Sequence, residues 1–386
     1  MPNPLNKHTV DLINQVVNVV DILNILSVDE HLEEMYNFFS KYQHHVFEVK
    51  DRLVILHHDL DYYNSTEIRN GNAGNTAYNL IKILSHFNIS TYHVVVLTNS
   101  VGGKQQDEFD YLCDMFNIER IKVIEFNLFY YFPDKVIDQP VLQLKKDYLF
   151  SNLNGISRTH RKIVLCSLLE KDLLKDGMVS WGQGSEVIDS QDDTINKSKF
   201  KGLPDDLHLR TIVPKFTRVN EELSLCKISK QQQIKYQTTL ESSFRSDSVY
   251  GNPNGPDTRW RADFLQQSFV YLVTESVGNY PHVYLTEKTW KAIVSMMPFL
   301  IVGATGTLKY LKNNGFKTFD SLWDESYDEI ENLYERVNRI TNILVHLRTQ
   351  NLDQLFQKCI PILEHNFAHL RNFQSNQLDK LTTTLI

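Results

Sequence analysis

The sequence predicts an α/β protein with two domains, each built around a parallel sheet. Short apolar runs alternate with segments of helical periodicity in both halves of the chain, as in successive βαβ units. The 386 residues exceed the size at which one hydrophobic core usually stops growing. We expect an N-terminal domain over residues 1–145, a second domain over residues 146–345, and a C-terminal helix over residues 346–386 that packs back on the body.

The N-terminal half begins with a predicted helix, because the apolar residues among the first 26 positions recur at helical spacing. Two βαβ units follow, and they predict a parallel, doubly wound sheet. Their strands are predicted at residues 53–56, 93–97 and 121–126, and their helices at residues 76–87 and 105–116.

The second half repeats the alternation, apart from residues 182–248, which are polar and irregular and are interpreted as loops and insertions. Its strands are predicted at residues 148–153, 178–181, 269–274 and 299–302, and the segment 317–319 is expected to continue the sheet. Its helices are predicted from Arg158 to about Lys175, from Thr286 onward, and at residues 308–313, 327–347 and 352–373.

Composition limits the classes of function. A net charge of −7 disfavours a large nucleic-acid footprint, although it leaves room for a local basic groove. The four cysteines lack the paired spacing of zinc sites, and we expect no metal site. The N-terminus is a poor secretion signal and no window has the ~20 uninterrupted apolar residues of a membrane helix. A cytoplasmic location is therefore expected, in a host cell if the protein is viral.

The most informative stretch is Tyr284-Leu285-Thr286-Glu287-Lys288, where a helix is predicted to begin. A helix start presents free backbone N–H groups and the positive end of its dipole, which stabilise an anion such as a diphosphate. Lys288 is unfavourable beside that dipole, so its position favours phosphate binding. Glu287 can accept hydrogen bonds from both hydroxyls of a ribose. The alternative is an ordinary helix start, with a capping threonine and a solvated lysine.

A second candidate is Arg158-x-x-Arg161, with His160 between the two arginines, at another predicted helix start. Two guanidinium groups oppose the helix dipole but suit bidentate contacts with phosphate. The alternative is a basic surface turn whose arginines pair with Glu170 or Asp172.

These residues carry a resemblance to known families. Glu275-Ser276, followed by Tyr284-x-Thr286-Glu287-Lys288 and the small-residue turn after Pro298, resembles the donor-binding motif of the α-1,3-fucosyltransferases. The chain departs from that motif because Ser276 follows Glu275 without an intervening asparagine. Residues 154–181 and 287–327 resemble glycosyltransferases of large DNA phages and giant viruses. The resemblance covers roughly residues 145–330.

The resemblance implies a GT-B-like glycosyltransferase, with two Rossmann-like domains facing a cleft and with extra N- and C-terminal helices. A nucleotide-diphosphate sugar would be the donor, and neither a metal nor another cofactor would be required. Arg161 and Lys288 would hold the diphosphate, Glu287 the ribose, and Tyr284 would line the donor pocket. The implied donor-binding set is Arg158 (as a substitute for Arg161), Arg161, Glu275, Tyr284, Thr286, Glu287 and Lys288.

Catalysis would also need a general base for the acceptor hydroxyl. The candidates His58, Asp59 and Asp61 follow the predicted strand 53–56, where side chains often line a cleft. A polar loop is the alternative interpretation. An Asp-x-Asp pair also occurs in metal-dependent transferases of the GT-A fold, but the phosphate-binding features of this chain lie in its C-terminal half.

Three functions remain open at this point. The first is transfer of a sugar to a glycan or lipid-linked acceptor, and the second is glycosylation of hydroxymethylated bases in phage DNA, which would need a basic groove. The third is a non-catalytic sugar-binding or structural protein with the same fold. The sequence indicates neither the sugar, nor the nucleotide base, nor an oligomeric state.

Overall fold

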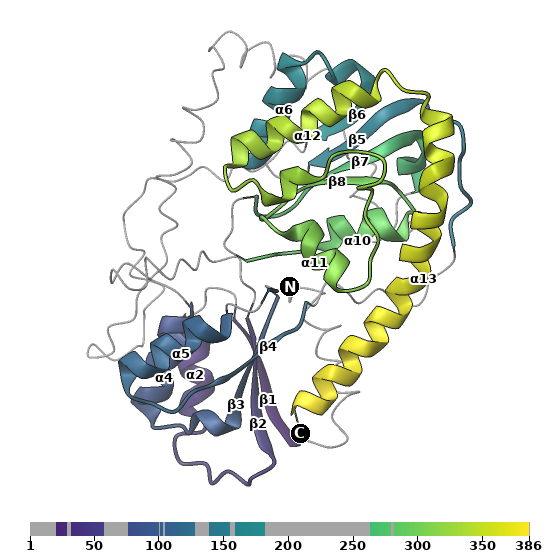
Figure 1. Cartoon of the computed structure of the whole chain (residues 1–386). Coiled ribbons are helices and arrows are strands. Elements are labelled where there is room, and N and C mark those ends of the chain that lie inside the picture. Colours follow the sequence, from purple (N-terminus) through teal and green to yellow (C-terminus); the bar gives the residue numbers. More distant parts are fainter. Residues whose placement is uncertain are drawn as a thin grey trace. The chain divides into compact units, whose positions relative to one another are not determined.

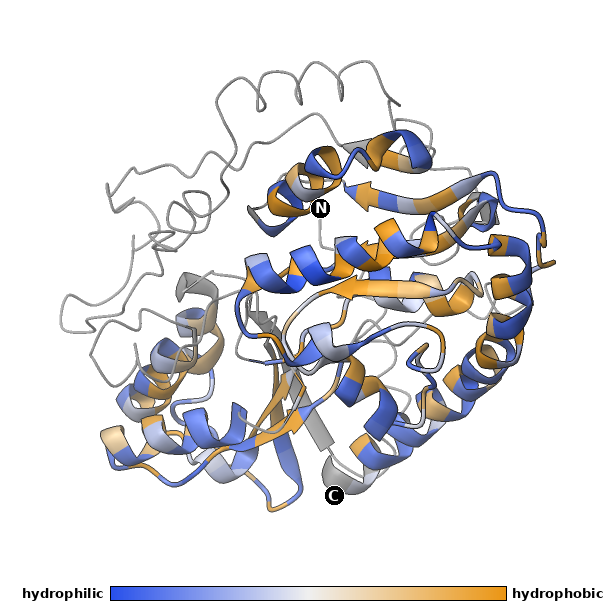
Figure 2. Ribbon diagram, turned by 45° about the horizontal axis from the view of Figure 1, so that its top comes forward, coloured by the Kyte–Doolittle hydropathy of each residue, from blue (hydrophilic) through white to orange (hydrophobic). Residues whose placement is uncertain are grey.

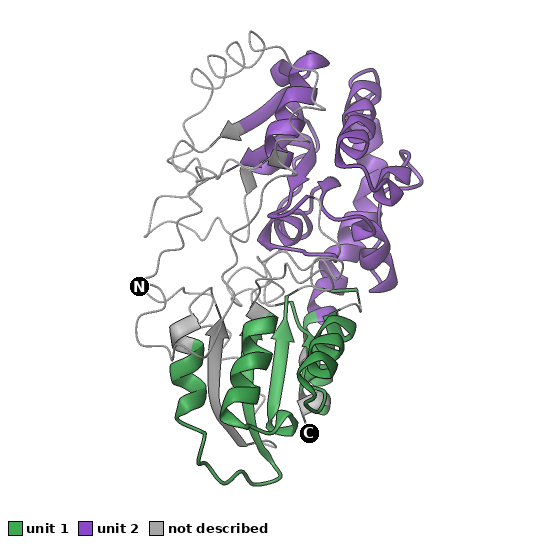
Figure 3. Cartoon of the chain, turned by 90° about the vertical axis from the view of Figure 1, so that its left-hand side faces the viewer, with its two compact units in different colours: residues 1–128, 191–214, 374–386 green, residues 129–190, 215–373 purple. Residues whose placement is uncertain are grey.

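The computed structural model describes residues 21–28, 32–57, 76–99, 101–102, 105–127, 139–154, 159–181, 263–278 and 282–385 (Figure 1). The chain forms two compact units (Figure 3). The described residues of unit 1 lie within 1–128 and 374–386, and those of unit 2 lie within 129–190 and 215–373. The predicted domain boundaries near residues 145 and 345, and the predicted cleft, stay predictions.

Unit 1 contains a four-stranded sheet in which every neighbouring pair of strands is parallel. Its strand order is β1-β2-β3-β4, which is the order along the chain. The strands are β1 (Asp21–Val28), β2 (Asp51–His57), β3 (Val94–Thr98) and β4 (Lys122–Glu125), and the helices are α2 (Leu32–Ser40), α4 (Thr76–Phe87) and α5 (Gln105–Phe116). The two predicted βαβ units are therefore confirmed.

Two predictions for this half are wrong. Residues 21–26 do not belong to a helix but to strand β1, which pairs with β2. A short run of Val, Ile and Leu suits a parallel strand as well as a buried helix, so the spacing of apolar residues could not decide between them. The described strands also follow one another without reversing direction, so the described part of this sheet is not doubly wound.

The core of unit 1 lies where its helices cover one face of the sheet. Leu53 and Ile55 of β2 and Val94 and Val96 of β3 point to this face, and they belong to one buried cluster with residues of α2, α4 and α5. Successive right-handed crossovers in one direction place their helices on the same face, which explains the single helical layer.

Unit 2 contains a second four-stranded parallel sheet, with strand order β6-β5-β7-β8. The chain passes from β5 to β6 on one side and returns to β7 on the other, so this sheet reverses direction between β5 and β7. The strands are β5 (Tyr148–Asn154), β6 (Gly177–Trp181), β7 (Ser268–Thr274) and β8 (Phe299–Val302). The prediction of a parallel α/β second domain is confirmed.

Helices cover both faces of the second sheet (Figure 1). Helix α6 (Thr159–Glu170) follows β5 and packs against α12 (Leu333–Leu347), where the hydroxyls of Ser167 and Thr341 are 2.8 Å apart. Helix α10 (Glu287–Val294) follows β7 and packs on β7 and β8. Right-handed crossovers that run in opposite directions place α6 and α10 on opposite faces.

Helix α13 (Leu352–Leu385) covers the α10 side with aromatic residues. Its Phe373 stacks on Trp290 of α10, with ring centroids 6.1 Å apart, and its Phe356 lies edge-on to Phe269 of β7. Figure 2 shows the strands of this sheet as mostly hydrophobic, whereas α13 alternates between hydrophilic and hydrophobic residues. None of the helices in the described ranges is long and apolar enough to cross a membrane.

The segment 317–319 does not continue the sheet, and that prediction is wrong. Side chains take the hydrogen bonds that a strand neighbour would have made. The backbone N–H and C=O of Lys317 both bond to the amide of Asn366 in α13, and the N–H of Phe319 donates to Glu325 at 2.7 Å. The segment is therefore a loop that α13 holds in place.

Candidate functional site

The strand reversal in unit 2 marks the place where open α/β sheets usually bind ligands, which is at the carboxyl ends of the strands. Polar side chains gather at these ends of β5 and β7. The Thr274 hydroxyl donates to Asn154 at 2.7 Å, and Asn154 in turn donates to Asn152 at 2.6 Å. All three side chains are buried. Sequence reasoning did not propose them, although two asparagines on one face of an apolar strand are a usable signal.

Glu275 follows β7 directly, and its side chain is 0% exposed. Its carboxylate fixes the start of α10. One oxygen accepts from the backbone N–H of Thr286 at 3.2 Å and from the hydroxyl of Thr289 at 2.5 Å, and the other accepts from the hydroxyl of Thr286. Three hydrogen-bond donors therefore contact one buried carboxylate, and these bonds offset the free-energy cost of removing it from water.

The backbone carbonyl of Glu275 fixes the start of α6. The ring Nε2 of His160 donates to it at 2.7 Å, and the guanidinium of Arg161 donates to it at 3.2 Å. Both side chains are buried, with Arg161 only 3% exposed, so the alternative of a basic surface turn is wrong for this arginine. The loop after β7 approaches α6 so closely that a Cβ atom on Gly278 would lie 2.6 Å from the Cβ of His160.

Helix α10 begins as predicted, with Thr286 as its N-cap residue. The Thr286 hydroxyl oxygen accepts from the backbone N–H of Lys288 at 3.4 Å. The ammonium group of Lys288 lies over this helix start. Its Nζ is 2.6 Å from a carboxylate oxygen of Glu287, 3.2 Å from the hydroxyl of Thr286 and 3.3 Å from the hydroxyl of Ser276.

The charges around Glu287 keep its carboxylate ionised. Burial by itself would raise the pKa of Glu287, but the adjacent Lys288, together with Lys291, lowers this pKa below its ordinary value. The Glu287 side chain keeps 30% of its surface exposed and that of Lys288 keeps 16%. The pair is therefore accessible at the surface of unit 2, next to the fully buried Glu275.

The site thus brings together Arg161, Glu275, Thr286, Glu287 and Lys288, five of the residues proposed from the sequence. Tyr284 lies in the same loop but is 2% exposed, and it packs against Ala304 and Val277. Four other proposed residues lie outside the described residues, namely the donor-site candidate Arg158 and the base candidates His58, Asp59 and Asp61. Their roles stay predictions.

Arg336 of α12 supports the site and was missed from the sequence. It is 1% exposed, and its guanidinium donates to the carbonyls of Gly278 and Ile330 at 2.6 and 2.8 Å and to the hydroxyl of Thr305 at 2.5 Å. It therefore ties together the loops that follow β7 and β8. Arg336 lies in an amphipathic helix and is not part of a recognisable motif, so the sequence gives no signal for such a role.

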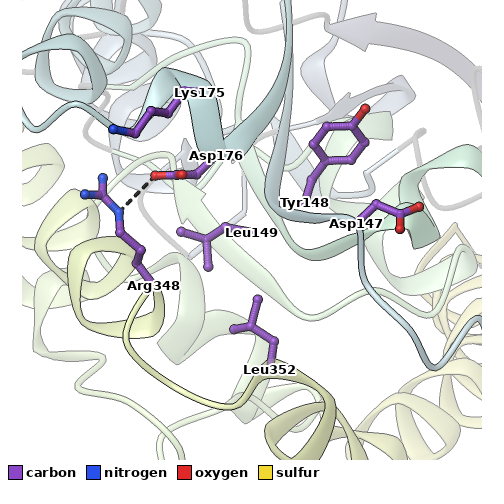
Figure 4. A pocket seen from close by; sticks show the side chains of 7 residues that line it. All are labelled: Asp147, Tyr148, Leu149, Lys175, Asp176, Arg348 and Leu352. Atoms are coloured by element: carbon purple, nitrogen blue, oxygen red, sulfur yellow. Dashed lines mark ion pairs between the residues drawn. The ribbon is translucent and has the colours of Figure 1, made fainter.

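A pocket of about 300 Å³ lies at the opposite edge of the sheet in unit 2 (Figure 4). It sits where β5 and β6 begin, whereas Glu275 follows the end of β7. Asp176 and Arg348 line it and form an ion pair of 2.9 Å. It is lined by Asp147, Tyr148, Leu149, Lys175, Asp176, Arg348 and Leu352. Within the described part of the chain, no three His, Cys, Asp or Glu side chains are grouped as a metal site requires.

No family model matches the chain, and no curated protein matches it. Among solved structures, it is similar to the crystal structure of the DNA-modifying enzyme β-glucosyltransferase, described in the presence and absence of the substrate uridine diphosphoglucose. The two share 10% sequence identity and a TM-score of 0.39 over 95% of this chain and 99% of that chain. A similarity of this degree does not support a conclusion about fold family or function, whereas the residues of the site do indicate a kind of ligand.

Proposed function

We propose that this protein is a glycosyltransferase that moves a sugar from a nucleotide-diphosphate sugar to an acceptor hydroxyl on a glycan or a related molecule. One observation carries the proposal. Two helix starts with the cationic side chains of Arg161 and Lys288 meet at Glu275 and Ser276, next to the strand reversal of unit 2. This combination suits a diphosphate better than a neutral ligand.

The diphosphate would bind at the start of α10, where Lys288 can exchange Glu287 for phosphate oxygens. The positive end of the dipole of α10 would add to this attraction. In the transfer step, the bond between the anomeric carbon and the diphosphate breaks, and negative charge grows on the departing nucleotide. Fixed cations and a helix dipole can stabilise that charge without a divalent metal. We therefore propose that the reaction is metal-independent.

Glu287 would bind the ribose. Its ionised carboxylate accepts hydrogen bonds only, and the two hydroxyls of a ribose offer two donors in a suitable geometry. The similarity of Tyr284-x-Thr286-Glu287-Lys288 to the fucosyltransferase donor motif supports this division of roles. For the acceptor hydroxyl we propose that His58, Asp59 or Asp61 acts as the general base.

A thermal-shift screen tests the donor site first. The purified protein is heated with UDP, GDP, CDP and ADP and with their sugars, first in EDTA and then with magnesium. We expect one nucleotide to raise Tm by several degrees in EDTA at about 100 times its Kd, because a ligand that binds only the folded state stabilises it. If no nucleotide shifts Tm in either condition, the proposal of a nucleotide-sugar donor site is wrong, and a non-catalytic role becomes the better interpretation.

The acceptor is tested with the donor sugar identified in that screen. Oligosaccharides and duplex DNA that contains hydroxymethylated bases are offered separately, and sugar transfer is measured by mass spectrometry. We expect transfer to a glycan, because the net charge of −7 opposes a large DNA footprint. Transfer to DNA alone, with salt-dependent retention on DNA, would reassign the acceptor but keep the donor site. Donor binding without hydrolysis or transfer would indicate a sugar-binding protein.

A further inference from the structure

We infer that Glu275 is a positioning residue of the proposed donor site, which aligns Lys288 and Arg161 without contacting the donor. This inference rests on the proposed function. The resemblance to the fucosyltransferases implies that Glu275 belongs to the donor-binding residues, but its side chain is 0% exposed, and three protein donors occupy its carboxylate. Its effect on a ligand must therefore pass through its neighbours.

Glu275 positions Lys288 through a first route, a chain of hydrogen bonds that passes through Thr286. A threonine hydroxyl has one hydrogen, and that of Thr286 is given to the carboxylate of Glu275. The oxygen of Thr286 is then left as an acceptor, and it receives both the backbone N–H of Lys288 at 3.4 Å and its ammonium at 3.2 Å. The carboxylate of Glu275, which accepts the Thr286 hydroxyl hydrogen, thus sets the direction of a hydrogen-bond chain that ends at the ammonium of Lys288.

A glutamine at position 275 would change that direction. Its amide NH₂ is a donor, so it would compete for the oxygen of Thr286 and leave the hydroxyl hydrogen to find another acceptor. The substitution would also remove the negative charge that the Thr286 hydroxyl now faces. Both changes move the ammonium of Lys288 away from its present position, although the shape of residue 275 is nearly conserved.

The second route runs through the backbone of Glu275. Its N–H donates to Val302 in β8 at 3.0 Å, and its carbonyl accepts from His160 and Arg161 of α6. One residue therefore links β8, the start of α6 and the start of α10. Two cationic groups that must reach one diphosphate need such a rigid link, because a displacement of about 1 Å already weakens a positioned contact.

The experiment compares Glu275→Gln with Glu325→Gln. Glu325 is a matched control, because its buried carboxylate also accepts from a threonine hydroxyl and a backbone N–H, those of Thr318 and Phe319. Pyrophosphate binding is measured by calorimetry in EDTA, well below Tm. We expect Glu275→Gln to raise Kd about tenfold, the effect of one charge-assisted hydrogen bond, and Glu325→Gln to leave it unchanged although its Tm falls. Equal Kd values for wild type and Glu275→Gln would overturn the inference.

A double-mutant cycle separates positioning from a general loss of structure. If Glu275 acts through Lys288, Glu275→Gln should weaken pyrophosphate binding much less in a Lys288→Ala background than in the wild type. An undiminished loss in that background would refute the route through Lys288. Should Glu275→Gln fail to fold, Thr286→Val replaces it, because it removes the same hydroxyl link to Lys288.

Failure of the proposed function gives a different result. It would appear as wild-type protein that binds neither pyrophosphate nor any nucleoside diphosphate, and the inference would fall with it. Failure of the inference alone would leave wild-type binding intact and the variants indistinguishable from their controls.

Discussion

The ammonium of Lys288 lies 2.6 Å from the carboxylate of Glu287, so the residues proposed to bind the diphosphate and the ribose are paired with each other. A donor that uses both residues must separate them. Partly exposed ion pairs of this kind contribute little to stability, so the separation costs little. A diphosphate that draws Lys288 away would free Glu287 to accept the ribose hydroxyls, which would couple the two halves of nucleotide recognition.

The first prediction concerns Lys288 and the diphosphate. Lys288→Ala should weaken the binding of the best nucleoside diphosphate by about 1.5–3 kcal/mol, because one charge-assisted contact is lost. Lys358→Ala is the control, since this lysine is exposed on α13. Calorimetry in EDTA gives both values. Equal affinity of Lys288→Ala and the wild type would contradict the assignment.

The second prediction is that a change at Lys288 does not weaken the binding of a ligand without phosphate. Lys288→Met should leave the binding of the corresponding nucleoside unchanged or make it tighter, because Glu287 loses the ammonium that occupies its carboxylate. The same variant should bind the nucleoside diphosphate more weakly than the wild type does. Both ligands are titrated into both proteins. Parallel weakening for nucleoside and diphosphate would show that Lys288 does not compete with the ribose.

The order of elements in unit 2 could be predicted because it is a local property of the chain. The strand 299–302 and the helix start at Thr286 were both predicted, since apolar runs and capping residues act on their near neighbours. Strand order is not local. The placement of β6 beside β5, with β7 returning on the other side, depends on how helices pack on the sheet.

The residues of the candidate site also fall into two groups, those that a local sequence motif reveals and those that are brought together only by folding. Thr286, Glu287 and Lys288 are consecutive, so a motif revealed them together. The bond between Glu275 and Thr286 joins residues 11 positions apart in the sequence, and that between Arg336 and Gly278 joins residues 58 positions apart. Such contacts appear only once the loops are folded. The helix prediction for residues 21–26 failed for a related reason, because only the pairing of residues 21–28 with β2 identified them as a strand, and residues 1–20 lie outside the described residues.

The third prediction concerns Arg336, which should matter for stability. Arg336→Met leaves the carbonyls of Gly278 and Ile330 and the hydroxyl of Thr305 without this donor. Buried acceptors that lose their partner cost about 1–3 kcal/mol each, and the losses are not additive, so we expect about 2–4 kcal/mol less free energy of unfolding.

Arg339→Met provides the control from the same helix. Its side chain is 53% exposed, and it contacts Asp324 only at 3.9 Å, so the change should be below about 1 kcal/mol. Urea unfolding measures both variants. Similar free energies for Arg336→Met and Arg339→Met would mean that Arg336 does not hold the loops of the site.

The fourth prediction is a pH dependence from Lys146. Burial lowers the pKa of this lysine from 10.5 to about 8, and the nearby Cys359 and Asp353 only partly offset that effect. Its ammonium lies 3.6 Å from the centre of the Phe356 ring and donates to the carbonyl of Gln266 at 2.9 Å. Because the pKa is lower in the folded protein, the unfolded chain binds more protons between about pH 8 and pH 10.5.

The free energy of unfolding therefore gains a contribution that rises with pH through this window, and Lys146→Met should lack it. Other lysines and tyrosines also titrate there, so the informative quantity is the difference between wild type and variant at each pH. Cys359 also contributes in this window, because burial raises its pKa from 9.0 to about 12 and the unfolded chain loses the thiol proton first, but wild type and variant share this contribution and it largely cancels in the difference. Urea unfolding at several pH values from 7 to 10.5 measures the difference. A difference that stays constant over this range would show that Lys146 keeps an ordinary pKa in the folded protein.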